Sequence, residues 1–106
     1  MIITSCENIA GKKIVKTLGL VKGNTIRARH IGRDIAALFR GIIGGEIVEY
    51  TKLIAESREQ SIDRMIAQAE ALGANAIIML RFSTSELMSG AAELLAYGTA
   101  VIIENE

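Results

Sequence analysis

The chain has 106 residues with no proline, no tryptophan, one cysteine and one histidine, and its twelve basic side chains balance its twelve acidic ones. This length predicts a single domain spanning residues 1–106. Zero net charge argues against a dedicated nucleic-acid-binding protein, and a lone cysteine excludes a disulfide framework. The longest uncharged runs have ten residues, against about 20 for a membrane helix, and the first residues lack the pattern of a signal peptide. We therefore expect a cytoplasmic protein that binds neither membranes nor nucleic acid.

The N-terminal part of the chain is rich in β-forming residues. Met1–Ser5 predicts a short strand, and residues 13–21 predict a second strand with a bulge or bend at Gly19. Lys22-Gly23-Asn24 is typical of a turn. Residues 25–30 then alternate in polarity and predict a third strand, which ends at the following glycine.

Two helices are expected next. Residues 34–43 have apolar side chains at helical spacing and predict a short helix that ends at Gly44-Gly45. Residues 46–72 predict a long amphipathic helix, and Gly73 is suited to terminate it. Arg58 lies within the apolar stripe, so we expect its stem to be packed and its head to pair with a carboxylate. The stripe consists of Ile47, Tyr50, Ile54, Ile62, Met65, Ala69 and Leu72.

The C-terminal part predicts two more strands, residues 75–82 and 93–104, separated by a polar loop over residues 83–90. Gly98, inside the last strand, indicates close approach of another backbone or side chain, within the chain or across a subunit boundary. Strands grouped before and after the helices favour an α+β fold, in which a mostly antiparallel sheet packs against the long helix and the short one.

Cys6 and His30 are the only soft or borderline metal ligands in the chain. A structural zinc site has roughly four such ligands, which one chain cannot supply. A symmetric ring could collect one copy from each subunit. The alternative interpretation is that Cys6 is a small apolar side chain and His30 an ordinary solvated one.

Arginines give the more specific hypothesis. Arg27 and Arg29 share one face of a predicted strand, and Arg81 ends an apolar strand where its head must reach an anion or water. These side chains could line an anion-binding pocket, with Glu93 as a neighbouring carboxylate and the Tyr97 hydroxyl as a polar partner. Alternatively, the same charges form an ion-pair network that secures an interface. No nucleophile–base pair or paired acids can be identified, so we do not expect an enzyme.

The runs TIRARHIGRDIAALFRGIIGGEIVEYTKLIAESRE, LGANAIIMLRF and TSELMSGAAELLAYGTAVII resemble the YbjQ family of uncharacterised prokaryotic proteins, which is labelled as heavy-metal-binding. The most specific pieces are Arg33-Asp34, Gly44-Gly45, Gly73-Ala74-Asn75-Ala76 and the run from Ala96 to Val101. The resemblance implies a dodecin-like α+β fold, a ring-shaped pentamer and a divalent metal ion as ligand.

Two functions follow as hypotheses. One is a homo-oligomeric, pentameric module that binds a metal or a small ligand between subunits. The other is an oligomeric structural or interaction protein without a small-molecule site.

Overall fold

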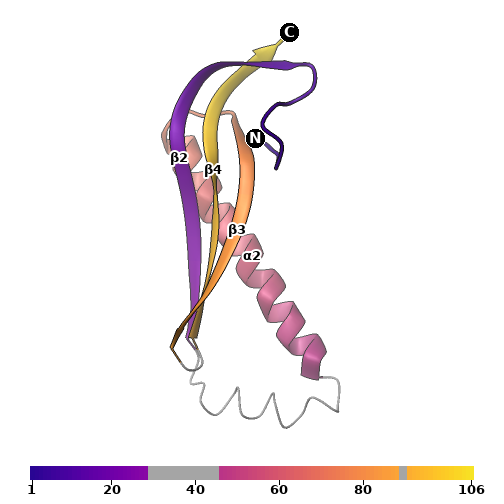
Figure 1. The fold of residues 1–106 in the computed structure, drawn as a ribbon, viewed down its shortest axis with the longest axis vertical. Helices are drawn as coiled ribbons and strands as arrows, with labels where there is room; N and C mark the ends of the chain where they lie inside the picture. Colours follow the sequence, from indigo (N-terminus) through magenta and orange to yellow (C-terminus); the bar gives the residue numbers. More distant parts are fainter. Residues whose placement is uncertain (29–45, 89–90) are drawn as a thin grey trace.

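The computed structural model describes residues 1–28, 46–88 and 91–106, and in these residues one helix packs against a four-stranded sheet (Figure 1). The elements are β1 (Ile2–Ile3), β2 (Lys12–Ala28), α2 (Glu46–Ala71), β3 (Ala76–Met88) and β4 (Ala91–Asn105). The strand order is β1-β3-β4-β2; β4 is antiparallel to both of its neighbours, and β1 is parallel to β3. The predicted α+β class is confirmed. The predicted helix over residues 34–43 lies outside the described residues.

Helix α2 begins at Glu46, as its sequence pattern predicts, and is one residue shorter than the predicted span of residues 46–72. It ends at Ala71, and Gly73 adopts a left-handed φ of 87°. The amide of Gly73 donates to the carbonyl of Glu70 at 2.9 Å, and the amide of Ala74 donates to that of Ala69 at 3.1 Å. These two bonds form a Schellman motif, which satisfies the last carbonyls of the helix.

The prediction of a turn at Lys22-Gly23-Asn24 is wrong. Strand β2 continues through these residues, and Gly23 pairs with Ala96 of β4. The predicted bulge at Gly19 is confirmed by a shift of register after Thr17 and by a φ of 125°. Gly23 serves close packing instead of a turn, because a Cβ at this position would lie 2.2 Å from the carbonyl oxygen of Ser61 in α2.

The predicted polar loop over residues 83–90 is also wrong for its described part. Strand β3 extends to Met88, and Ser83 and Ser85 pair with Leu95 and Glu93 of β4. Small hydroxyl side chains suit a strand whose pairing is set by its neighbour, so tertiary context overrides their local preference for loops. The loop prediction for residues 89 and 90 lies outside the described part of the chain.

The core lies between α2 and one face of the sheet. Alternate residues of β4 from Leu94 to Ala100 are buried on this face, where they meet Met65 and Ala69 of the helix. A Cβ on Gly98 would lie 2.8 Å from the Ile77 Cγ2 atom, so the predicted close approach is confirmed and its neighbour is β3 of the same chain. The rest of the cluster is Val21, Ile77, Ala96 and Ala100.

The buried stripe of α2 differs from the predicted one. Ser57 and Ser61 are buried, at 2% and 0% exposure, whereas Ile54 and Leu72 are exposed. Arg58 is exposed as well, which corrects the expectation that its stem is packed. The helix lies close against the sheet at this point, and small polar residues allow that approach better than large apolar ones.

Hydroxyl groups replace apolar contacts at this close crossing of helix and sheet. The Ser61 hydroxyl donates to the carbonyl of Leu94 at 3.0 Å and lies 3.2 Å from the Thr25 hydroxyl, which is itself 3.4 Å from the carbonyl of Ser57. The side chains of Thr25, Ser57 and Ser61 are almost fully buried. Because a buried hydroxyl without a partner is costly, these bonds are what make the polar crossing stable.

The N-terminal segment forms a strap beside β3. The Thr4 amide donates to the carbonyl of Ile77, and the amides of Leu80 and Met79 donate to the carbonyls of Thr4 and Cys6, all at 3.0 Å. Met79 has a φ of 57°, at a bulge where β3 shifts register against β4. Ile9 packs over a second buried cluster on the sheet face turned away from α2, which consists of Ala76, Ile78, Val101 and Ile103.

Candidate functional site

Beyond the N-terminal strap, the sheet face turned away from α2 has no covering element among the described residues. We call it the open face; it consists of Glu93, Leu95, Tyr97 and Thr99 of β4 and the residues that pair with them on β2 and β3. Residues paired across antiparallel strands project on the same side of a sheet, so each rung places three side chains in a row. Figure 1 is viewed with α2 behind the three long strands, so this face is toward the reader.

The central row of the open face carries two cations around an aromatic ring. Tyr97 pairs with Lys22 on one side and with Arg81 on the other. Lys22 and Arg81 are exposed, and Tyr97 is half-buried. Two strand spacings separate the cations by about 10 Å at the backbone, a distance that their long side chains can reduce over the tyrosine.

Arg81 is oriented by backbone carbonyl groups. Its Nη1 atom donates to the carbonyl of Ser5 and to that of Leu80, both at 2.8 Å. The guanidinium therefore links β3 to the N-terminal strap, and its remaining N–H groups are available to an acceptor on the open face. The sequence predicts that the head of Arg81 meets an anion or water. In the structure this side chain is exposed, and two backbone carbonyl groups accept hydrogen bonds from its guanidinium.

Glu93 lies four residues along β4 from Tyr97, on the same face. Its Oε2 atom accepts a hydrogen bond of 3.0 Å from the Asn24 side-chain amide on β2. Three of the predicted binding residues, Arg81, Glu93 and Tyr97, therefore share one surface. The surface can present donors and a phenol to an anionic group at the Tyr97 rung, and a carboxylate to a cationic or hydroxyl group at the Glu93 rung, with the Leu95 rung between them.

Among the other predicted residues, only Arg27 can be placed relative to this grouping. The register places Arg27 opposite Ala92, five positions along β4 from the partner of Arg81. Arg29 and His30 lie outside the described residues. The described residues therefore place Arg27 and Arg81 at separate positions of the sheet, and the predicted pocket of three arginines stays a prediction.

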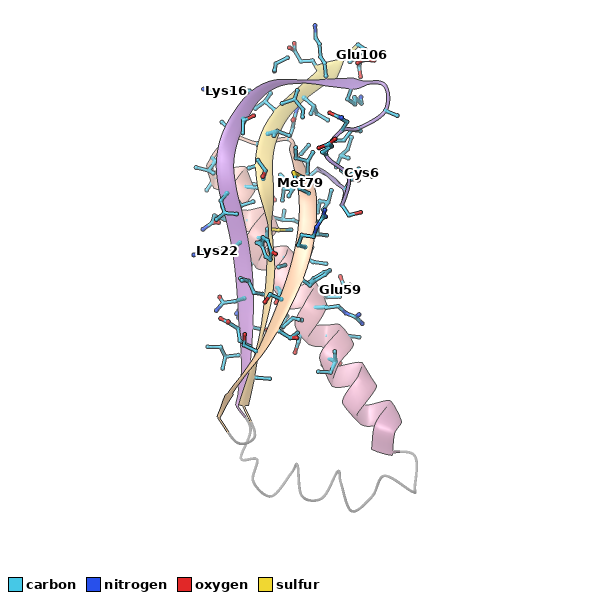
Figure 2. The ribbon with its side chains drawn as sticks, viewed as in Figure 1. Cys6, Lys16, Lys22, Glu59, Met79 and Glu106 are labelled. Atoms are coloured by element: carbon cyan, nitrogen blue, oxygen red, sulfur yellow. The ribbon has the colours of Figure 1, made fainter. Side chains whose placement is uncertain are left out.

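The described residues of one chain do not fit a heavy-metal site. Cys6 is exposed, and within these residues no three side chains of the types His, Cys, Asp and Glu are grouped to hold a metal ion. The carbonyl of Cys6 accepts a hydrogen bond from the amide of Met79, and Figure 2 shows these two residues at the same level of the molecule. The thiol of Cys6 and the thioether of Met79 are together too few ligands for a tight metal site.

Two residues of the open face were missed by sequence reasoning. Lys22 and Asn24 belong to the segment that resembles a turn, and this resemblance hides their alternation with the flanking strand. The signal was present, because Leu20, Lys22, Asn24 and Ile26 are spaced by two. A strand that continues through Gly23 places all four side chains on one face.

No described helix is long and apolar enough to cross a membrane.

Comparisons with known proteins give a consistent result. A family model described as "Putative heavy-metal-binding" (YbjQ_1) matches residues 1–104. A UPF0145 protein of Dehalococcoides mccartyi is 62% identical over 104 residues, covering 98% of this chain and all of the relative. A UPF0145 protein of Methanosarcina acetivorans is 53% identical over 105 residues, with 99% of each chain covered.

Among solved structures, a Pediococcus pentosaceus protein of unknown function from the DUF74 family matches with a TM-score of 0.66 and 18% identity, covering 98% of each chain. At this identity the match concerns the fold alone.

Proposed function

Since this chain belongs to the YbjQ family, also named UPF0145, we propose that it is a homo-oligomeric binding module of the cytoplasm, whose ligand site lies between subunits on the open face. The observation that carries this proposal is the pairing of large exposed apolar side chains with a row of cations on one sheet face. Leu20 is 66% exposed and Ile26 is 55% exposed, on either side of Lys22 along β2. Large exposed apolar side chains at both ends of a polar row, on a sheet face that no described element covers, favour coverage by another protein surface.

The chemistry of the central row favours a small anionic ligand. A guanidinium and an ammonium on either side of a phenol can hold a carboxylate or phosphate group, and covering the face would remove competing water. The exposed face of an isolated subunit is too flat to enclose such a ligand, because small-molecule sites bury most of the ligand surface. The site therefore requires a second subunit.

A ring of about five subunits is proposed from the family resemblance, and closed rings are common among homo-oligomers. A metal ion is the second candidate ligand. It is favoured by the family description and by the exposed Cys6, of which a ring would present one copy per subunit. Such a site would need ligands from several chains, so it would bind less than one metal per chain.

The test is native mass spectrometry and elemental analysis of protein purified without additives or affinity metal. We expect an assembly of several subunits that retains a small anionic compound, and an Arg81→Gln variant that loses this compound while keeping the assembly. A monomer at micromolar concentration would contradict the proposal. An assembly with no ligand and no metal would favour the purely structural function, and one metal per assembly, lost in Cys6→Ser, would favour the metal.

A further inference from the structure

The open face changes its chemistry along β4 from one row to the next. Cations lie on both sides of Tyr97 in the first row, an amide and a hydroxyl flank Leu95 in the second, and Glu93 brings a carboxylate to the third. The flanking residues of the three rows, in the same order, are Lys22 and Arg81, Asn24 and Ser83, and Ile26 and Ser85. Neighbouring rows are about 7 Å apart, because they are two residues apart on an antiparallel strand. A ligand that lies along β4 would therefore meet positive, neutral and negative groups in that order.

The cations of the first row can hold an anion. Within residues 1–28, 46–88 and 91–106, neither Lys22 nor Arg81 forms an ion pair with a carboxylate. Arg81 donates to two backbone carbonyl groups instead, and both side chains are exposed. A phosphate monoester carries about two negative charges at neutral pH and has more acceptor oxygens than a carboxylate, which carries a single charge. Two cations in one row, with the Tyr97 hydroxyl between them, therefore favour a phosphate group.

Glu93 requires a different chemical group at the other end of the ligand. Its side chain is half-buried, and its Oε2 atom accepts a hydrogen bond of 3.0 Å from the Asn24 side-chain amide, which orients the carboxylate. In the described part of the chain, no other side chain donates to Glu93. An ionised carboxylate accepts about four hydrogen bonds and donates none, so the ligand must bring N–H or O–H groups to it. Two donors side by side match the two oxygens of the carboxylate.

The middle row suits a sugar and the flat side of a ring. Leu95 is half-buried and gives this row an apolar floor. The exposed hydroxyl of Ser83, beside Leu95 on β3, can donate to a sugar hydroxyl or accept from one. A nucleoside monophosphate carries phosphate, sugar and base in the order in which the three rows offer partners. The long side chains of the first row can incline toward the phosphate and adjust the spacing.

We propose that the open face binds a guanine nucleotide, with its phosphate between Lys22 and Arg81 and the Watson–Crick edge of its base on Glu93. This proposal rests on the proposed binding function and names the class of its ligand. Guanine presents two adjacent N–H donors on this edge, which a carboxylate can accept together. Adenine and cytosine place an acceptor nitrogen beside their amino group, and uracil has acceptors on both sides of its single N–H, so each would bring a lone pair toward the carboxylate.

The experiment is isothermal titration calorimetry of the assembled protein with four probes: guanosine, adenosine and inosine monophosphates, and inorganic phosphate. We expect the guanosine probe to bind at least tenfold more tightly than each of the others, because inosine lacks one donor and adenosine lacks the matched pair. Glu93→Gln keeps an acceptor for Asn24 and should abolish this preference. Arg81→Gln should weaken all three nucleotides by a similar factor, about tenfold or more. Glu104→Gln is the matched control, because it makes the same change on β4 at an exposed position paired with Lys13, outside the three rows.

Each result either supports the proposal or overturns it. A guanine preference that is lost in Glu93→Gln and kept in Glu104→Gln supports it. Equal binding of the three nucleotides, weakened by Arg81→Gln, overturns guanine recognition and leaves the anion site of the proposed function intact. A preference that survives Glu93→Gln overturns the placement of the base. An assembled parent that binds no probe overturns the guanine ligand, and a monomeric parent overturns the proposed function itself. Light scattering and circular dichroism confirm that each variant assembles and folds, and Lys22→Gln tests the first row if Arg81→Gln does not.

Discussion

Gly23 of β2 lies directly against Ser61 of α2, so closely that a Cβ atom on the glycine would stand 2.2 Å from the serine carbonyl oxygen. The amide nitrogen of Met65 would be 2.4 Å away. Both neighbours are backbone atoms of a helix, which cannot move aside as a flexible side chain can. The crossing of helix and sheet therefore depends on the absence of a side chain at this position.

Gly23→Ala should lower the free energy of unfolding by about 3 kcal/mol or more, because the helix must shift away from the sheet and open the core beneath it. Urea denaturation followed by circular dichroism measures this change. Thr17→Ala, an exposed position on the same strand, is the control and should change stability by less than about 0.5 kcal/mol. Equal stability of Gly23→Ala and the parent would mean that α2 does not approach β2 this closely.

Ser61→Ala should cost about 1–3 kcal/mol, because it removes the hydrogen bond to the Leu94 carbonyl and one partner of the buried Thr25 hydroxyl. The double variant Ser61→Ala/Thr25→Val should be more stable than the sum of its single changes predicts, since no hydroxyl is then left unsatisfied between these two positions. Thermal unfolding of the four proteins forms a double-mutant cycle. Strict additivity would argue against the contact.

Asn75 acts as an additional strand partner for β4. Its side-chain nitrogen donates to the Ile103 carbonyl at 2.9 Å, and its Oδ1 atom accepts from the Ile103 amide at 2.7 Å. Asn75→Ala should lose both bonds and about 1–3 kcal/mol. Asn75→Asp keeps an acceptor for the amide but loses the donor and brings a negative charge to a carbonyl, so it should recover little. Hydrogen exchange at the Ile103 amide reports the loss directly, and unchanged protection would contradict the assignment.

Arg58→Ala should change the free energy of unfolding by less than about 0.5 kcal/mol, because the side chain is exposed. This expectation reverses the one drawn from the helical stripe, where a buried arginine would be expected to cost several kcal/mol when truncated. Chemical denaturation distinguishes the two. A loss above about 2 kcal/mol would indicate that another subunit covers Arg58.

Metal binding should be weak in the isolated subunit. Adding zinc or copper, or removing metal with a chelator, should leave the melting temperature nearly unchanged, because a ligand stabilises the native state only where it binds that state. Melting curves of the parent, Cys6→Ser and His30→Ala test this expectation. A rise in melting temperature with metal that disappears in either variant would identify a true ligand.

Sequence patterns were most informative where one physical signal acted alone. The helix over residues 46–71 and its end at Gly73 follow from periodicity and from the conformational freedom of glycine. The long strand β2 did not follow, because Gly23-Asn24 has the local chemistry of a turn, and only the distant Ser61 explains the glycine. Ser57 and Ser61 were likewise missed because apolar periodicity does not register buried hydroxyls.

The candidate site was only partly predictable for a related reason. Tyr97 and Glu93 belong to one strand, so their common face follows from alternation. Arg81 joins them only because β3 contains an extra residue near Met79, which changes the face on which later side chains project. No local signal in the sequence specifies that bulge. Lys22 joins them because β2 pairs with β4, although Lys22 and Tyr97 are about seventy residues apart in the sequence. Only the register of the two strands brings these residues together.

All register shifts of the long strands occur outside β4. Extra residues interrupt β2 and β3, whereas β4 runs without one between them. Removal of one residue at a β2 bulge would therefore straighten an outer strand and leave the inner one undisturbed. Removal of one residue from β4 would exchange its two faces against both neighbours at once, exposing the core alanines. Over evolutionary time, insertions and deletions should therefore accumulate in the flanking strands while the length of the central strand stays constant.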